Sequence, residues 1–273
     1  MPAFDRDSIH FNYVDTGIGL PFVFQHGLGG DVNQPLGFFA DVLQASPPFR
    51  MISLDCRGHG ETRPLGPESK LTIEQFADDI VALLDNLEVS QTVVGGISMG
   101  AAISLNLALH YPERIRGLIL SRPAWLDRPD PENLAILKHV AALIREHGCD
   151  AGRERFLQST EYAAIVDESP DVAQSLLSQF EHPRAVETVA KLERIPADAP
   201  CRDRAEWASI AVPVLVLANR QDPIHPFAFG EILAAGIPGA ELREVTPKSV
   251  DVSSHEKDVR TCILDFINRR IDN

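Results

Sequence analysis

The sequence is poor in cysteine and has no long hydrophobic run. Its cysteines, Cys56, Cys149, Cys201 and Cys262, are scattered without a C-x-x-C pair, which favours neither a zinc site nor a disulfide framework. We therefore expect no bound metal and reduced thiols. No stretch is apolar enough to span a bilayer, and residues 1–7 lack the basic and then apolar pattern of a secretion signal. These absences predict a soluble, cytoplasmic protein without a membrane partner.

Positive charge is also scarce. The sequence has 25 lysines and arginines against 39 aspartates and glutamates, which gives a formal net charge of −14 at pH 7. This charge repels phosphate backbones, and no cluster of basic residues offsets it. We therefore expect no nucleic acid as partner, while the oligomeric state stays open.

Hydrophobic residues are abundant enough for a large core. They make up 44% of the 273 residues, a length that allows one α/β domain with an insertion or two small domains. Ile9, Phe11 and Tyr13 alternate with polar residues, as in a half-buried strand. Further strands are predicted at 21–25, 51–54, 117–120, 212–218 and 242–245. The pattern between about 121 and 207 is helical instead. We therefore predict a core formed by residues 1–121 and 208–273, with a helical cap inserted at 122–207.

The most informative stretch is 93–102, an apolar run that ends in Gly-x-Ser-x-Gly and continues into small helix formers. A serine in a sharp strand-to-helix turn needs very small residues two positions away on either side, because side chains there would collide. Gly96 and Gly100 meet this need. The turn would expose Ser98 at the positive end of the following helix, so that Ser98 is a candidate nucleophile. The five residues alone also fit a tight turn without chemistry.

Capping signals mark where two helices begin. Thr72 and Gln75 form a capping box before an apolar stripe, and Ser253 and Glu256 predict another for the last helix, with His255 in its first turn. A further helix is expected over 99–110. Within the insertion, helices are expected over 134–144, 156–165, 172–180 and 186–192.

A serine hydroxyl is a poor nucleophile until a base removes its proton, and a carboxylate must hold that base in one tautomer. Asp222 follows the strand at 212–218, and His255 precedes the last helix. Both would lie, like Ser98, in loops at the carboxyl ends of strands, where open α/β sheets bind their ligands. The chain order serine, aspartate, histidine is that of one fold.

On these residues the chain resembles the α/β-hydrolase family, close to its esterase, lactonase and cofactor-free haloperoxidase branch. The motifs are "HGLGG" at 26–30, "DCRGHG" at 55–60, "GISMG" at 96–100, "VPVLVLANRQDPIHP" at 212–226, and the histidine before the last helix. The resemblance implies a mostly parallel, twisted sheet flanked by helices, with the cap inserted before the strand that carries the acid. It also implies Ser98 as nucleophile, His255 as general base and Asp222 as the orienting carboxylate. The backbone N–H groups of Leu28 and Met99 would form the oxyanion hole.

Two alternatives stay open for the catalytic triad. Asp251 lies four residues before His255 and competes with Asp222 as the acid. His225 lies three residues after Asp222 and competes with His255 as the base, because it can line the same crevice. The approach to His255 also lacks the glycine that the family often has there. We interpret His26 as a residue that shapes its loop.

The resemblance implies hydrolysis of a small carboxylic ester, lactone or thioester through an acyl-enzyme, without a metal or an organic cofactor. Ser98 sets the chain apart from the dehalogenases and epoxide hydrolases of this fold, which attack with an aspartate. Arg122, Trp125 and His225 are candidate substrate contacts. Arg122 would clamp a substrate carboxylate or join the cap to the core by a salt bridge, and Trp125 would contact substrate or pack in the core.

Other activities also fit this set of residues. Carbon–carbon bond hydrolysis and perhydrolase activity would use the same triad. A ligand receptor or binding protein with a vestigial hydrolase site is the alternative from another class, because fold alone does not fix function.

Overall fold

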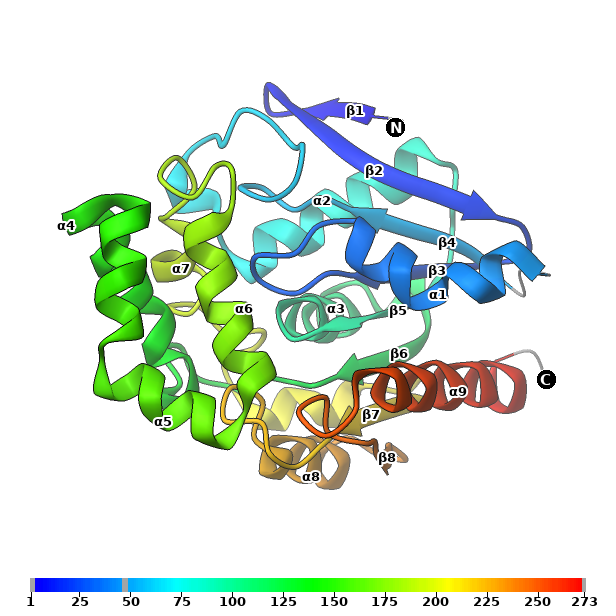
Figure 1. Ribbon diagram of the computed structural model, residues 1–273. Coiled ribbons are helices and arrows are strands. Elements are labelled where there is room, and N and C mark those ends of the chain that lie inside the picture. The colour runs from blue at the N-terminus through cyan, green and yellow to red at the C-terminus, as the bar shows by residue number, and fades with distance from the viewer. Residues whose placement is uncertain (1–2, 46–48, 272–273) are drawn as a thin grey trace.

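The computed structural model describes residues 3–45 and 49–271 (Figure 1). The predicted core covers residues 1–121 and 208–273. Of these, residues 1–2, 46–48 and 272–273 lie outside the described part. The expectation about residues 1–7 also falls partly outside it. Of the helices in the described ranges, none is both long and apolar enough to cross a bilayer.

An eight-stranded sheet forms the centre of the protein, in the order β1-β2-β4-β3-β5-β6-β7-β8. The β1–β2 and β2–β4 pairs are antiparallel, and every later pair is parallel. The mostly parallel sheet of an α/β-hydrolase is thus confirmed, and β1 is an addition that the sequence pattern did not indicate. The strands are β1 (Ala3–Arg6), β2 (Ile9–Gly17), β3 (Leu20–Gln25), β4 (Phe49–Leu54), β5 (Thr92–Ile97), β6 (Ile115–Ser121), β7 (Val214–Ala218) and β8 (Glu241–Glu244).

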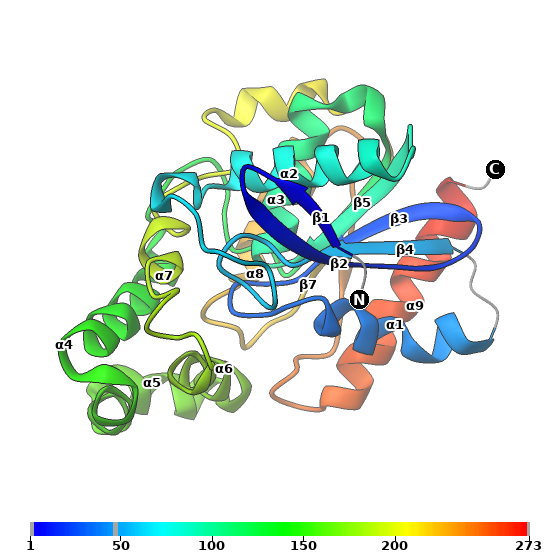
Figure 2. The same cartoon turned by 90° about the horizontal axis from the view of Figure 1, so that it is seen from above.

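Helices cover both faces of the sheet (Figure 2). One face carries α1 (Asn33–Ala45) and α9 (Val252–Arg270), and the other carries α2 (Ile73–Asn86), α3 (Met99–His110) and α8 (Phe227–Gly236). Since successive side chains of a strand point to opposite faces, neighbours such as Val93 and Val94 in β5 belong to different hydrophobic cores. The sheet is therefore buried on both sides, and its strand ends are left to form the site.

Helices, turns and loops make up residues 122–207, which we call the inserted segment. Its helices are α4 (Ala135–Leu157), α5 (Thr160–Glu168), α6 (Pro170–Glu181) and α7 (Lys191–Arg194), with short 3-10 turns at Glu132–Leu134 and Arg204–Ser209. Figure 1 shows α4, α5 and α6 gathered at one end of the sheet. The prediction of a helix over 186–192 is wrong for the most part. Residues 186–190 form turns, and the helix α7 begins only at Lys191.

The helix starts agree with the sequence in one case and differ in the other. The Thr72 side chain accepts a hydrogen bond from the N–H of Gln75 at 3.2 Å, which confirms Thr72 as the N-cap. The second half of the predicted capping box does not form, because the Gln75 side chain donates to Asp79 instead. At α9 the N-cap is Asp251 rather than Ser253, because the Asp251 carboxylate accepts from the N–H of Ser254 at 2.5 Å. Helix α9 therefore begins earlier than predicted.

Candidate active site

Ser98 lies in the turn between β5 and α3, with φ 57° and ψ −109°. Non-glycine residues rarely adopt positive φ, so this strained conformation is typical of a nucleophile elbow. A Cβ atom on Gly96 would lie 2.5 Å from the carbonyl carbon of Gly100, and one on Gly100 would lie 2.3 Å from the backbone oxygen of Gln25. The predicted need for glycine at both positions is confirmed.

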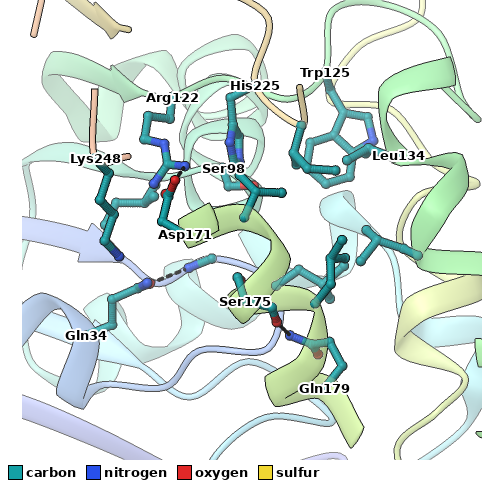
Figure 3. Close-up of a pocket in the computed structure, with 17 residues that line it drawn as sticks. Gln34, Ser98, Arg122, Trp125, Leu134, Asp171, Ser175, Gln179, His225 and Lys248 are labelled. Atoms are coloured by element: carbon teal, nitrogen blue, oxygen red, sulfur yellow. Dashed lines mark hydrogen bonds and ion pairs between the residues drawn. The ribbon is translucent and has the colours of Figure 1, made fainter. Parts of the chain in front are cut away.

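A cavity of about 120 Å³ adjoins Ser98, between the strand ends and the inserted segment (Figure 3). Most of the predicted site residues line it, namely Ser98, Leu28, Arg122, Trp125 and His225. Met99, Asp222 and His255 do not. The structure therefore gathers the nucleophile and the predicted substrate contacts around one cavity, with the predicted acid behind its wall.

Asp222 follows β7 and uses both carboxylate oxygens. Its Oδ1 accepts hydrogen bonds from the backbone N–H of His225 at 3.1 Å and from Nδ1 of the same residue at 2.9 Å. Its Oδ2 accepts from Nε of Arg122 at 2.8 Å and pairs with a terminal nitrogen of that guanidinium at 2.6 Å. Burial alone would raise the pKa of Asp222, but His225 and Arg122 outweigh it and hold this pKa well below its usual range. The carboxylate is ionised near neutral pH.

His225 is the histidine that bonds this carboxylate. The ionised Asp222 favours the tautomer with the proton on Nδ1, which leaves Nε2 as an acceptor, and Nε2 is buried without a partner among the described residues. Figure 3 shows the His225 ring next to Ser98. Burial lowers the pKa of His225, Asp222 raises it and Arg122 lowers it, with a net fall. The neutral ring, which can take up a proton, is therefore favoured.

His255 has other partners. It lies in the first turn of α9, where its Nδ1 is 2.8 Å from the backbone oxygen of Thr246 and its ring packs against Phe38. Burial lowers the pKa of His255. In the described part of the chain it forms no hydrogen bond with Asp222 or Ser98. The predicted pairing of His255 with Asp222 is thus not formed, because other groups occupy both oxygens of that carboxylate.

The alternative acid, Asp251, is exposed and caps α9, so it bonds neither histidine within the described residues. His26 has a structural place. Its Nδ1 lies 2.8 Å from the Gly27 oxygen, and its Nε2 accepts from the N–H of Cys56 at 3.2 Å. The interpretation that His26 shapes its loop is confirmed.

The two backbone groups predicted for an oxyanion hole come from the loop after β3 and from the start of α3. Leu28 follows Gly27 in the loop after β3 and lines the cavity. Met99 is the first residue of α3, where an N–H group has no acceptor within its own helix. Over residues 3–45 and 49–271, neither N–H takes part in a hydrogen bond.

Arg122 and Trp125 line the cavity, and both also hold the surrounding structure together. Besides Asp222, the Arg122 guanidinium lies 3.8 Å from the carboxylate of Asp171, which belongs to α6. Arg122 therefore joins α6 of the inserted segment to Asp222 at the end of β7. Trp125 is 2% exposed, so its ring is part of the core and of the cavity wall together.

Five further polar side chains of the cavity were missed by sequence reasoning, and two of them are Ser175 and Gln179 of α6. Gln34 comes from α1, Asp171 from α6 and Lys248 from the loop between β8 and α9. Lys248 had a signal in the sequence, since its loop follows the carboxyl end of a strand. Gln34 and Asp171 had none, because only tertiary packing brings their helices to the cavity. Across the described ranges, no three His, Cys, Asp or Glu side chains form a group that could hold a metal ion.

The mostly parallel sheet flanked by helices places the protein in the α/β class of folds. A model of the alpha/beta hydrolase fold family matches residues 21–249. The chain therefore belongs to the α/β-hydrolase family, and its relatives make it a hydrolase enzyme.

Several of these relatives are known by activity. The chain is 29% identical over 227 residues to 3-oxoadipate enol-lactonase 2 of Acinetobacter baylyi. The matched region covers 79% of this chain and 76% of that protein. It is 26% identical over 249 residues to a 2-hydroxymuconate semialdehyde hydrolase of Pseudomonas putida, with 85% and 80% covered. Among solved structures, the enol-lactonase of Burkholderia xenovorans LB400 superposes on this chain with a TM-score of 0.75 at 26% identity. The superposition covers 98% of this chain and 100% of the enol-lactonase chain.

Proposed function

We propose that the protein is a serine hydrolase that cleaves a small carboxylic ester, lactone or thioester through an acyl-enzyme, with Ser98, His225 and Asp222 as catalytic residues. The observation that carries this proposal is the 2.9 Å hydrogen bond from His225 to Asp222 at the wall of the cavity that contains Ser98. The base in this proposal is the alternative histidine, because His225 bonds Asp222 and lines the cavity, whereas His255 does neither among the described residues.

The arrangement fits the chemistry of acyl transfer. Asp222 holds the proton of His225 on Nδ1, so that Nε2 accepts the proton of Ser98 as the serine oxygen attacks the carbonyl carbon. Negative charge then develops on the former carbonyl oxygen. The N–H groups of Leu28 and Met99 stabilise it, and one such donor typically lowers the barrier by about 3 kcal/mol. His225 next protonates the leaving group, and in the second half it activates the water that hydrolyses the acyl-enzyme.

The hydrogen bond between Ser98 and His225 that catalysis requires is not formed in the described structure, where the Ser98 hydroxyl has no partner. Such bonds are often long before substrate binds and tighten in the reacting complex. The shared cavity and the unpartnered Nε2 of His225 support this assignment.

The substrate is small in this proposal. An apolar cavity of about 150 Å³ holds a molecule the size of benzene, and the cavity beside Ser98 has about 120 Å³. Val172 and Leu176 of α6 line this cavity, so we infer that the inserted segment acts as a cap that excludes bulk water from the acyl-enzyme. A cytoplasmic location without a nucleic-acid or membrane partner also belongs to the proposal and rests on the cysteine pattern and the net charge of −14.

Carbon–carbon bond hydrolysis is the second candidate. It is favoured by the similarity to the 2-hydroxymuconate semialdehyde hydrolase of Pseudomonas putida. The same nucleophile and base would act on a ketone carbonyl, so the two candidates differ in substrate and not in the residues that react.

A panel of esters and lactones of increasing acyl length tests the proposal, with Ser98→Ala as control. We expect turnover of the short members, loss of at least about 10⁴-fold in kcat in Ser98→Ala, and covalent labelling of Ser98 by a fluorophosphonate. Folded protein that neither turns over any member nor reacts with the fluorophosphonate would support the binding-protein alternative instead.

A further inference from the structure

The cavity beside Ser98 has two chemically different sides. Figure 3 shows Arg122, Asp171 and Lys248 on one side and Trp125 and Leu134 on the other, with Ser98 and His225 between them. The apolar side is formed by Trp125, Leu134, Leu137, Val172, Leu176 and Ile224. A substrate that fills both sides must therefore carry an apolar and a polar or charged part around its reacting carbonyl.

The charges on the polar side differ in their pairing. Arg122 is held by the carboxylates of Asp222 and Asp171. Asp171 also accepts a hydrogen bond from the Ser169 hydroxyl at 2.7 Å. Lys248 lines the same side, and within the described residues it has no hydrogen bond and no carboxylate within 4.0 Å. Lys248 is therefore the cation of this cavity whose charge is not yet matched.

The neighbour of Lys248 suits an anion as well. Figure 3 shows the end of the Lys248 side chain directed toward Gln34. The Oε1 of Gln34 accepts from the backbone N–H of Gly27 at 2.8 Å, which fixes the amide so that its Nε2 is the free end. In the described part of the chain this Nε2 donates to no acceptor. An ammonium and an amide N–H thus stand together without acceptors, in a protein whose net charge is −14.

We propose that Lys248, with the help of Gln34, binds a carboxylate of the substrate, so that the enzyme selects short esters or lactones that carry a negative charge. This inference rests on the proposed function, since it names the substrate class of the same site. Arg122 is not the carboxylate clamp in this assignment, because its guanidinium is already bonded to Asp222 and would have to give up that partner to bind substrate.

Matched pairs of small substrates test this assignment. One pair is monoethyl succinate, a monoanion at neutral pH, against diethyl succinate, which puts the carboxylate on the acyl side. The other is acetoxyacetate against its methyl ester, which puts it on the alcohol side. We expect the wild type to prefer the anionic member of at least one pair, and Lys248→Met to lower kcat/KM for that member by about 10- to 100-fold while the neutral member changes little.

Two further variants make the result specific. Lys248→Arg keeps the charge and is expected to retain most of the preference. Lys257→Met removes the same charge from an exposed position of α9 outside the cavity and is expected to leave the preference unchanged. Equal losses for charged and neutral substrates in Lys248→Met, or a wild type without preference for charge in either pair, would overturn the assignment.

A binding measurement separates this inference from the proposed function. In Ser98→Ala, calorimetry with succinate and with acetoxyacetate is expected to show binding that Lys248→Met weakens by a similar factor. Binding that depends on Lys248 without any turnover by the wild type would sink the proposed function and leave the anion site standing. Turnover without any dependence on Lys248 would do the reverse.

Discussion

At the scale of single residues, His225 has two properties that a general base needs. Its Nδ1 donates to an ionised carboxylate, and its Nε2 is buried beside Ser98 without a partner in the described structure. Its pKa is lowered, chiefly by burial. A base must be neutral to accept a proton, so a lower pKa extends activity toward acid.

This gives a direct expectation for the pH dependence. The value of kcat/KM should be constant near neutral pH and fall toward acid, with a midpoint below about 6.5, the ordinary pKa of histidine. This fall in kcat/KM reports protonation of His225, because the carboxyl of Asp222 keeps its charge to much lower pH. A midpoint clearly above that value, found with a substrate for which chemistry limits the rate, would contradict a buried histidine base.

Which residues the sequence could predict depends on how local their geometry is. The conformation of Ser98 and the need for Gly96 and Gly100 follow from one turn, and these predictions are confirmed. The partner of Asp222 depends on two loops and on where α9 begins. Because Asp251 caps α9 instead of Ser253, the position of His255 relative to the cavity could not be read from the capping pattern.

At the scale of elements, the order of strands and helices was predictable because buried parallel strands read as continuous apolar runs. The short edge strand β1 was not, since it has no strong periodic pattern, and the turns before α7 were not, since residues 186–192 have a helical pattern that the structure does not follow. The elbow between β5 and α3 depends most on close packing. Gly100 lies against the backbone of Gln25 at the end of β3, which fixes the distance between α3 and the sheet.

Substitution Gly100→Ala tests this packing. The added methyl group would lie 2.3 Å from the Gln25 oxygen, so α3 must shift. We expect the free energy of unfolding to fall by about 1 to 3 kcal/mol and fluorophosphonate labelling of Ser98 to slow, as measured by denaturant titration and by mass spectrometry. Gly37→Ala in α1 is the control, because no atom lies within 4 Å of its added carbon. Similar behaviour of the two variants would argue against the close approach.

At the scale of the whole molecule, the inserted segment is bonded to the core through a buried arginine. The Arg184 side chain is 7% exposed and donates to the backbone oxygens of Gly60 and Thr62, at 3.1 and 2.9 Å. These carbonyls belong to the loop after β4. The contact is therefore one of the points that hold the segment to the core.

We expect Arg184→Met to lower the free energy of unfolding by about 1.5 to 3 kcal/mol, the range for lost hydrogen bonds to a charged group. It should also raise KM, because a looser segment closes the cavity less completely. Arg145→Met is the matched control, since Arg145 is exposed and pairs with Glu193 within the same segment. Equal changes in both variants, in denaturant titration and steady-state kinetics, would remove Arg184 as an anchor.

The central claim is that Asp222 acts through His225. It is tested most directly by the rate at which a fluorophosphonate modifies Ser98 in His225→Gln and in His255→Gln, measured on folded protein at pH 7.5. We predict that His225→Gln slows labelling by about 10² to 10⁴-fold, the usual contribution of a general base, and that His255→Gln stays within about tenfold of the wild type. A large loss in His255→Gln with a nearly normal rate in His225→Gln would contradict the account and restore His255 as the base.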